Sequence, residues 1–213
     1  MNPQIRFGED LMSRVSYVMM HSEGADLLTS AIREAINGLF VELTTEASNL
    51  VEDILEIALV ANPIMHHIVL GINPVNLGTA PFVLTTSDAV DTRAAEMGLN
   101  AHPEARLYCL PCIAGHVGAD AAGVILAEAP DRNEDMTLVV DVGTNAEIVL
   151  ANNERLLVCS SPTGPAFEGA QISSGQRATI GAIERVQINR DTLEPRFKCI
   201  GSELWSDESG FTE

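Results

Sequence analysis

Hydrophobic positions in the first 130 residues switch between a helical and a strand-like pattern. Apolar residues recur at three- and four-residue steps from Leu28 through Leu39 and Leu43, with charged residues on the other face, which predicts an amphipathic helix. A shorter helix is predicted from Phe7 to Met20. Continuous apolar runs at 56–61 and 106–110 are typical of strands that are covered on both faces. The alternation predicts an α/β fold.

Glycine, proline and asparagine mark where further elements begin and end. Asn62 suits a helix N-cap, Pro63 suits the first helical position, and Gly71 suits the residue that ends the helix. Residues 72–104 are rich in loops, with one short helix expected around Thr92 to Gly98. After Pro111, small residues continue to Ala127 and predict a helix that approaches a neighbour closely.

The hydrophobic period changes at Met136. Short apolar runs at 137–141, 147–150 and 156–159 are separated by Gly and Asn turns, which predicts an antiparallel meander. The charged stretch 130–135 just before them is the predicted domain boundary. We therefore expect one domain at 1–130 and a second at 136–213.

Charge and composition exclude several classes of function. The 213 residues contain 12 basic and 30 acidic side chains, a formal net charge of −18. This balance provides no basic footprint, so we expect no nucleic-acid partner and no anionic membrane partner. Residues 1–10 lack the apolar centre of a secretion signal, and a cytoplasmic location is expected. Lys198 is the single lysine, which excludes a Walker-type phosphate loop.

Four cysteines raise the question of a metal or redox centre. Cys109 and Cys112 have the spacing of a half-site, but they follow a predicted strand, whereas redox pairs usually open a helix. Cys159 and Cys199 stand 40 residues apart, too dispersed for a typical second zinc pair. We expect structural thiols.

The stretch Asp141–Asn145 is the strongest candidate for chemistry. Asp141 ends an apolar strand, Gly143 lets several amides aim at one point, and Thr144 adds a hydroxyl. Such a turn can cradle phosphate oxygens, and an aspartate beside phosphate needs a hydrated divalent cation between them. An ordinary hairpin with an Asx-type cap explains the same residues.

Other candidate positions also have two interpretations. The segment Ser161–Ala170 contains Gly164, Pro165 and Glu168 and can be interpreted in two ways. It is either a helix start that contacts a nucleotide or a tight strand-to-helix connection. Asp120 caps the small-residue helix or orients a water. His66 and His67 are adjacent, so on a helix they cannot chelate one metal together, and packing is the expected role.

Five segments together resemble the ATPase region of the reductive activators of corrinoid proteins, in the acetate and sugar kinase, chaperone and actin superfamily. They are Asn2–Asp10, Asn62–Gly71, Ala114–Asp120, Asp141–Glu147 and Gly164–Ala170. The resemblance implies an actin-like ATPase with ribonuclease-H-like lobes. Residues 1–130 would be a first lobe without its opening strands, with the crossing helix, and 136–213 the beginning of a second lobe.

The resemblance also implies a function and a set of site residues. Family members couple ATP hydrolysis to the reduction of a Co(II) corrinoid to Co(I), and their partner is a corrinoid protein of a methyltransferase system. Asp141 and Asp120 would be catalytic, with Asp141 holding Mg²⁺ through water. The residues implied for ATP or ADP are Gly143, Thr144, Asn145, Glu147, Gly164 and Glu168.

By the same resemblance the chain is a part of a longer activator or a truncated relative. Its single hairpin matches the second of two phosphate hairpins, and the 2Fe–2S cluster belongs to a parent domain absent here. We expect a folded chain that binds ATP weakly alone and forms a homodimer through uncovered sheet edges. Two alternatives stay open: a non-catalytic module that docks the corrinoid protein, and a small-molecule kinase of the same superfamily.

Overall fold

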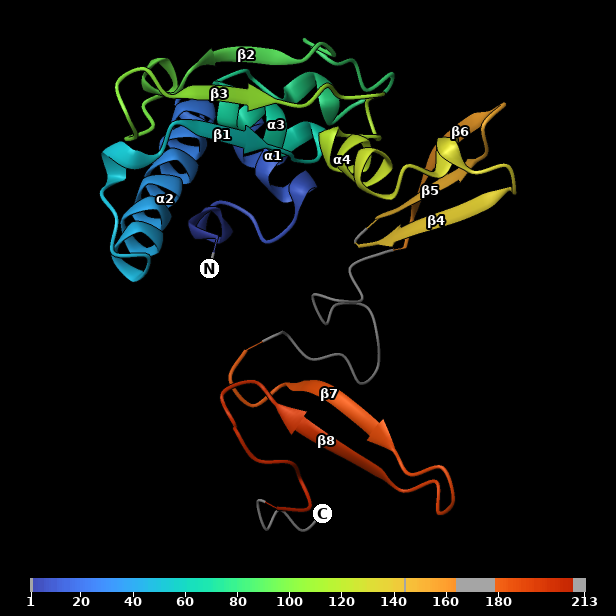
Figure 1. Cartoon of the computed structure of the whole chain (residues 1–213). Coiled ribbons are helices and arrows are strands. Elements are labelled where there is room, and N and C mark those ends of the chain that lie inside the picture. Colours follow the sequence, from blue (N-terminus) through green and yellow to red (C-terminus); the bar gives the residue numbers. More distant parts are fainter. Residues whose placement is uncertain (1, 144, 164–178, 209–213) are drawn as a thin grey trace. The chain divides into compact units, whose positions relative to one another are not determined.

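A computed structural model describes residues 2–143, 145–163 and 179–208 of the chain (Figure 1). The chain divides into two compact units, one of Met1–Asp141 with Glu147–Ser160, the other of Val142–Ala146 with Ser161–Glu213. Within the described residues, no helix is both long and apolar enough to cross a membrane.

The longer helices are α1 Leu11–Met20, α2 Gly24–Glu46, α3 Pro63–Leu70 and α4 Ala119–Glu128. The 3-10 turns are η1 Pro3–Arg6, η2 Val51–Asp53, η3 Val75–Leu77, η4 Ala94–Met97 and η5 Pro130–Arg132. The strands are β1 Glu56–Leu59, β2 Val90–Arg93, β3 Arg106–Cys109, β4 Thr137–Val142, β5 Asn145–Ala151, β6 Leu156–Pro162, β7 Ile183–Ile188 and β8 Pro195–Cys199.

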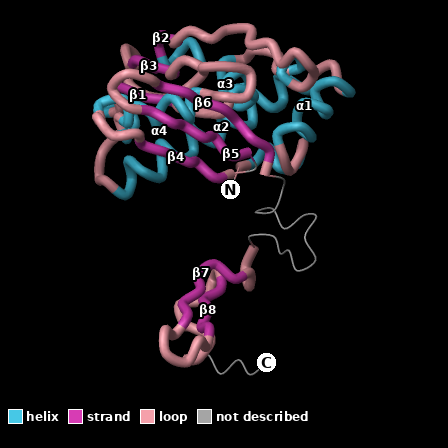
Figure 2. The backbone as a smooth tube through the Cα atoms, turned by 90° about the vertical axis from the view of Figure 1, so that its right-hand side faces the viewer, coloured by secondary structure: helices cyan, strands magenta, loops and turns pink. Residues whose placement is uncertain are grey.

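The first sheet of unit one has the order β1-β3-β2. β1 runs parallel to β3 and β2 antiparallel to it, with Ala58 opposite Tyr108. Helices α1, α2 and α3 lie on one side of this sheet (Figures 1 and 2). The expectation that these strands are covered on both faces is wrong for the described residues. Ala58 and Tyr108 are exposed, since the helices cover only the face that Leu107 and Cys109 share.

The core of this unit consists of two clusters of buried side chains. Val15 of α1 packs with Leu28 of α2 and Ile68 of α3 in one cluster, while Leu107 and Cys109 pack beneath the sheet in the other. The predicted amphipathic helix is confirmed as α2, and Leu28 is fully buried in it. Leu39 and Leu43 were expected on the same buried face, but they are 53% and 60% exposed. The apolar stripe of α2 is therefore only partly covered.

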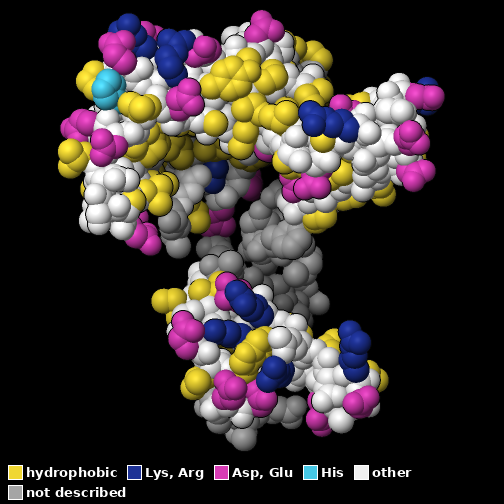
Figure 3. All heavy atoms as spheres, in the orientation of Figure 1, with side chains coloured by type: hydrophobic (Ala, Val, Ile, Leu, Met, Phe, Trp, Pro, Cys, Tyr) yellow, Lys and Arg dark blue, Asp and Glu magenta, His cyan; other side chains and the backbone are white. Residues whose placement is uncertain are grey.

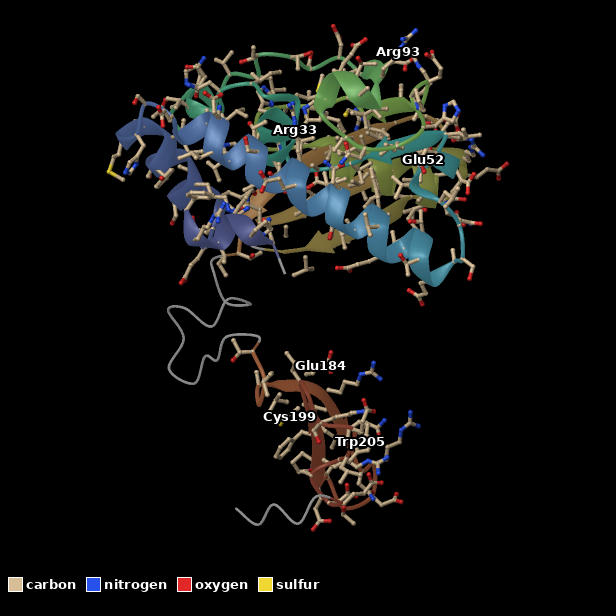
Figure 4. All side chains as sticks on the ribbon, turned by 90° about the vertical axis from the view of Figure 1, so that its left-hand side faces the viewer. Arg33, Glu52, Arg93, Glu184, Cys199 and Trp205 are labelled. Atoms are coloured by element: carbon tan, nitrogen blue, oxygen red, sulfur yellow. The ribbon has the colours of Figure 1, made fainter. Side chains whose placement is uncertain are left out.

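Helix α3 has the ends that its sequence predicts. The Asn62 side chain accepts a hydrogen bond from the Met65 N–H at 3.0 Å, and Gly71 ends the helix at a φ of 77°. Arg33 of α2, labelled in Figure 4, donates to the Val69 carbonyl through Nε and Nη2. Capping and cross-helix bonding together hold α3 against α2.

Two predicted helices begin later than expected, and a third is confirmed. The first helix begins at Leu11 rather than Phe7, because the Asp10 carboxylate accepts the Ser13 N–H and caps it there. The short helix expected around Thr92 to Gly98 is confirmed as η4, which Gly98 ends, although Thr92 and Arg93 belong to strand β2, since β2 pairs with β3. The small-residue helix begins at Ala119, because Ala114 and Val117 form a β-bridge in the preceding turn.

The predicted meander is confirmed as a sheet of order β4-β5-β6. Buried side chains in it come from β5, where Val149 and Ala151 are 2% and 0% exposed. Leu138, Val140 and Val142 of β4 are exposed on the other face. These exposed side chains make one face of this sheet apolar and open within the described chain. Figure 3 shows hydrophobic side chains at several places on the surface of the molecule.

The described part of the second unit is dominated by the β7-β8 hairpin. Arg196 lies over the ring of Trp205, which is labelled in Figure 4, at 4.7 Å. Arg196 also pairs with Asp207, and Lys198 pairs with Glu203. The opposite face carries Val186 beside Phe197. This hairpin was not predicted from the sequence.

Candidate functional site

Polar side chains replace apolar ones at one end of a single face of the β4-β5-β6 sheet. Strand alternation places Asp141 on the same face as Val139, and Glu147 on the same face as Val149. Ser160 follows Val158 in the same way on β6. Each strand thus carries an apolar position in its middle and a polar one two residues further toward this end of the sheet. The arrangement gives polar groups a rigid support.

Asp120 approaches this polar end from the first turn of α4. Its N–H donates to the Ala61 carbonyl at 3.2 Å, and its Oδ1 accepts the Ala121 N–H at 2.9 Å. A Cβ at Gly118 would lie 2.5 Å from Asp120 Oδ1 and 2.7 Å from the Asn62 Cα. Glycine at 118 therefore allows α4 to start directly against the end of β1 and fixes where the Asp120 carboxylate lies.

Three carboxylates interact electrostatically at this place. Burial raises the pKa of Asp120, and the charge of Asp141 raises it further. Burial likewise raises the pKa of Glu147, with added repulsion from Asp120 and Asp141. The structure thus brings together Asp120, Asp141 and Glu147, which are separated by up to 27 positions in the sequence. Like charges gathered in a partly buried place are typical of sites that bind a cation or move a proton.

Ser160 belongs to this group although no sequence motif contains it. Its hydroxyl donates to Glu147 Oε1 at 2.9 Å, between neighbouring strands β6 and β5. That bond opposes the rise in the Glu147 pKa. Ser160 could have been found from the alternation Leu156-Val158-Ser160, because it is the polar continuation of a half-buried face.

The turn after Asp141 bonds internally. The Gly143 N–H donates to the Asn145 carbonyl at 2.8 Å, and the Thr163 hydroxyl donates to the Gly143 carbonyl. The Gly143 amide expected to face phosphate is thus bonded within the turn. Thr144, Gly164 and Glu168 lie outside the described residues.

The side chains available as metal ligands limit which cation could bind at this site. Across the part of the chain that the structure describes, no three His, Cys, Asp or Glu side chains are grouped to hold a metal ion directly. Carboxylate oxygens are nonetheless the ligands that Mg²⁺ prefers, and Mg²⁺ usually keeps several of its waters. Asp120, Asp141 and Glu147 offer carboxylate oxygens of the kind that could hold a hydrated Mg²⁺ through its waters.

Two of the cysteines and two of the histidines lie in packed surroundings. Cys109 and Cys112 are free thiols in the core, and burial raises the pKa of Cys109 to about 11. A thiol with so high a pKa is a poor nucleophile and a poor metal ligand at neutral pH. His66 and His67 are fully buried, and His67 bonds to the Pro63 carbonyl and the Thr85 N–H. The packing role expected for this histidine pair is confirmed.

Comparison with known families gives two matches that cover nearly the whole chain. Residues 1–133 match the RACo middle region. Residues 135–211 match the C-terminal domain of RACo, described as the ASKHA domain. The two matches meet between residues 133 and 135. The assignment of residues 1–130 to a first actin-like lobe stays a prediction.

Individual relatives agree with the family matches. The corrinoid activation enzyme RamQ of Eubacterium limosum is 36% identical over 186 residues, covering 87% of this chain and 31% of RamQ. The [Co(II) methylated amine-specific corrinoid protein] reductase of Methanosarcina barkeri is 42% identical over 73 residues, 34% of this chain and 14% of that protein.

A solved structure gives the same result at the level of the fold. The reductive activator for corrinoid, iron–sulfur protein superposes with a TM-score of 0.80 at 34% identity, covering 94% of this chain and 32% of that one. The chain spans about a third of the length of that protein and of RamQ. It belongs to the RACo family, with its first 133 residues in the middle region and residues 135–211 in the ASKHA domain, the actin-like ATPase domain.

Proposed function

We propose that this chain is the part of an ATP-dependent reductive activator that couples phosphate binding to the return of a corrinoid protein from Co(II) to Co(I). The observation that carries the proposal is the group of Asp120, Asp141 and Glu147 at one end of the β4-β5-β6 sheet. It lies in a chain of the RACo family, whose relatives are named for corrinoid activation and for reduction of a Co(II) corrinoid protein.

The three carboxylates take different roles in this proposal. Asp141, exposed at the end of β4, holds the waters of Mg²⁺, which neutralises phosphate charge when the nucleotide is bound. Asp120 accepts a proton from, or orients, the water that attacks the terminal phosphate. Glu147 lies on the side of the three carboxylates that faces β6, where the Ser160 hydroxyl donates to it. Gly143, Thr144 and Asn145 contribute the turn that approaches the phosphates, with Gly164 and Glu168 following along the chain.

Helix α4 gives Asp120 a mechanical connection to the rest of the first unit. Its first turn is bonded to Ala61, which lies in the three-residue connection between β1 and α3. A change in the Asp120 environment on phosphate release therefore acts on the junction of β1 and α3. This connection is how the proposed ATP hydrolysis would reach the corrinoid partner.

The remaining features of the proposal concern assembly and location. We expect a cytoplasmic protein, and its charge of −18 provides no basic surface for a nucleic-acid or membrane partner. The 2Fe–2S cluster that passes the electron belongs to a domain outside residues 1–213. The uncovered sheet face and edges favour a homodimer, which light scattering on the purified chain would reveal as twice the 22.8 kDa mass.

The function can be tested by replacing the matching region of RamQ with this chain. The chimera is mixed with a Co(II) corrinoid protein, a reductant and Mg²⁺, and the absorbance of Co(I) is followed with and without ATP. ATP-dependent formation of Co(I) is the expected result. Reduction that proceeds equally without ATP would instead favour the docking-module alternative, and phosphorylation of an added acid or sugar would favour a kinase.

A further inference from the structure

The contact between Ser160 and Glu147 differs from an ordinary surface pairing of polar side chains. The two residues lie 13 positions apart and come from adjacent strands, with 2.9 Å between Ser160 Oγ and Glu147 Oε1. Both side chains are half-buried, whereas the next residue, Ser161, is exposed. The bond therefore joins two groups on the inner face of the sheet.

Glu147 needs such an anchor to stay where it is. Desolvation and the charges of Asp120 and Asp141 all disfavour a carboxylate at this position. A glutamate has three rotatable bonds, so without a restraint its carboxylate could turn toward solvent and reduce the repulsion. A hydroxyl donor favours the ionised carboxylate and limits its orientation.

We propose that Ser160 is a positioning residue, whose hydroxyl holds the Glu147 carboxylate beside Asp120 and Asp141 as a partner for the waters of nucleotide-bound Mg²⁺. This role rests on the proposed function, since it assigns Ser160 to the same site. Ser160 touches neither phosphate nor metal in this assignment. It acts through Glu147 alone.

Two measurements on the 213-residue chain test this role. Carbon-13 NMR follows the titration of the Glu147 carboxyl in the free protein, and a second NMR titration follows the binding of Mg²⁺ with ATP. In Ser160→Ala, the pKa of Glu147 should rise and the affinity for Mg²⁺ with ATP should fall about tenfold, as expected for a lost hydrogen bond to a charged group. Ser160→Thr keeps the hydroxyl and should behave like the wild type. Ser161→Ala is the matched control and should change neither quantity.

The outcomes separate the positioning role from the proposed function. If Ser160→Ala leaves the Glu147 pKa unchanged, or the wild type binds nucleotide and this variant binds it equally well, the positioning role is overturned. If the wild type binds no Mg²⁺ with ATP at all, yet Ser160→Ala still raises the Glu147 pKa, the contact is supported and the nucleotide function assigned to this chain is what fails.

Discussion

The two three-stranded sheets of the first unit differ in what their residues do. In β1-β3-β2, the central strand β3 places Leu107 and Cys109 in a core covered by helices, and both are fully buried. In β4-β5-β6, Leu138, Val140 and Val142 of β4 are exposed, and polar groups gather at one end of the other face. The first sheet is built for packing, and the second supports charged groups that folding alone does not favour.

This difference shows how to separate residues that stabilise from residues that act. A buried leucine contributes to folding in proportion to the apolar area that it removes from water. Carboxylates such as Asp120 and Glu147, whose pKa values are raised by burial and by each other, oppose folding when they are ionised. Residues that are unfavourable for stability and still grouped together point to function.

The largest effect is expected from comparing the same substitution in the two sheets. Leu107→Ala should destabilise the chain by about 2–5 kcal/mol, because it leaves a cavity under β3. Leu138→Ala, at a side chain that is 61% exposed, should change stability by no more than about 0.5 kcal/mol. Urea unfolding measures both. Equal losses would mean that a cover is present on β4 in solution.

Two glycines test whether close approach matters where α4 meets β1. Gly118→Ala should destabilise by about 1–3 kcal/mol, since the added carbon would meet the Asn62 backbone. Gly38→Ala, in the exposed middle of α2 with nothing within 4 Å of the new carbon, should stabilise by about 0.5–1 kcal/mol. The thermal midpoints should therefore move in opposite directions. A neutral Gly118→Ala would contradict the tight junction described for Asp120.

The N-cap of α3 should contribute a smaller amount. Asn62→Ala removes the acceptor of the Met65 N–H and should cost about 1 kcal/mol. Asn62→Asp keeps an acceptor and serves as the control in the same unfolding experiment. If both variants lose the same stability, the side chain of Asn62 acts in some way other than capping.

The smallest effect is a pH dependence with a defined sign. Because the pKa of Asp120 is higher in the folded chain than in the unfolded one, its contribution to stability falls as pH rises through the carboxylate range. Asp120→Asn removes this loss and keeps the Oδ1 acceptor. Its stability relative to the wild type, measured by urea unfolding at each pH, should therefore increase from pH 4 to pH 7. If the stability of Asp120→Asn relative to the wild type instead decreases as pH rises, the raised pKa of Asp120 is contradicted.

Much of the fold follows from local patterns, and the differences have physical causes. The caps Asn62 and Gly71 and the meander could be predicted, because capping and strand alternation are local. The strand β2 could not be, because residues 90–93 become a strand only by pairing with β3, a contact between distant parts of the chain. The exposure of Leu39 on α2 likewise depends on what covers the helix, which no local pattern contains.

The candidate site could be predicted only where its residues belong to one local motif. Asp141 and Glu147 belong to one hairpin, so a single motif contains both. Asp120 lies 21 positions before Asp141 and reaches it only because α4 starts against β1. Ser160 carries no motif of its own, and only the hydrogen bond across the sheet links it to Glu147.

The central claim is that the carboxylates at the polar end of β4-β5-β6 serve ATP hydrolysis, and the rate of that hydrolysis tests it directly. In the RamQ chimera, Asp141→Asn should lower steady-state turnover of ATP about a hundredfold, because one preorganised electrostatic contact to the reacting phosphate is lost. The variant should remain folded, since Asp141 is exposed. A folded Asp141→Asn protein that hydrolyses ATP at the unaltered rate would contradict the account and remove Asp141 from the mechanism.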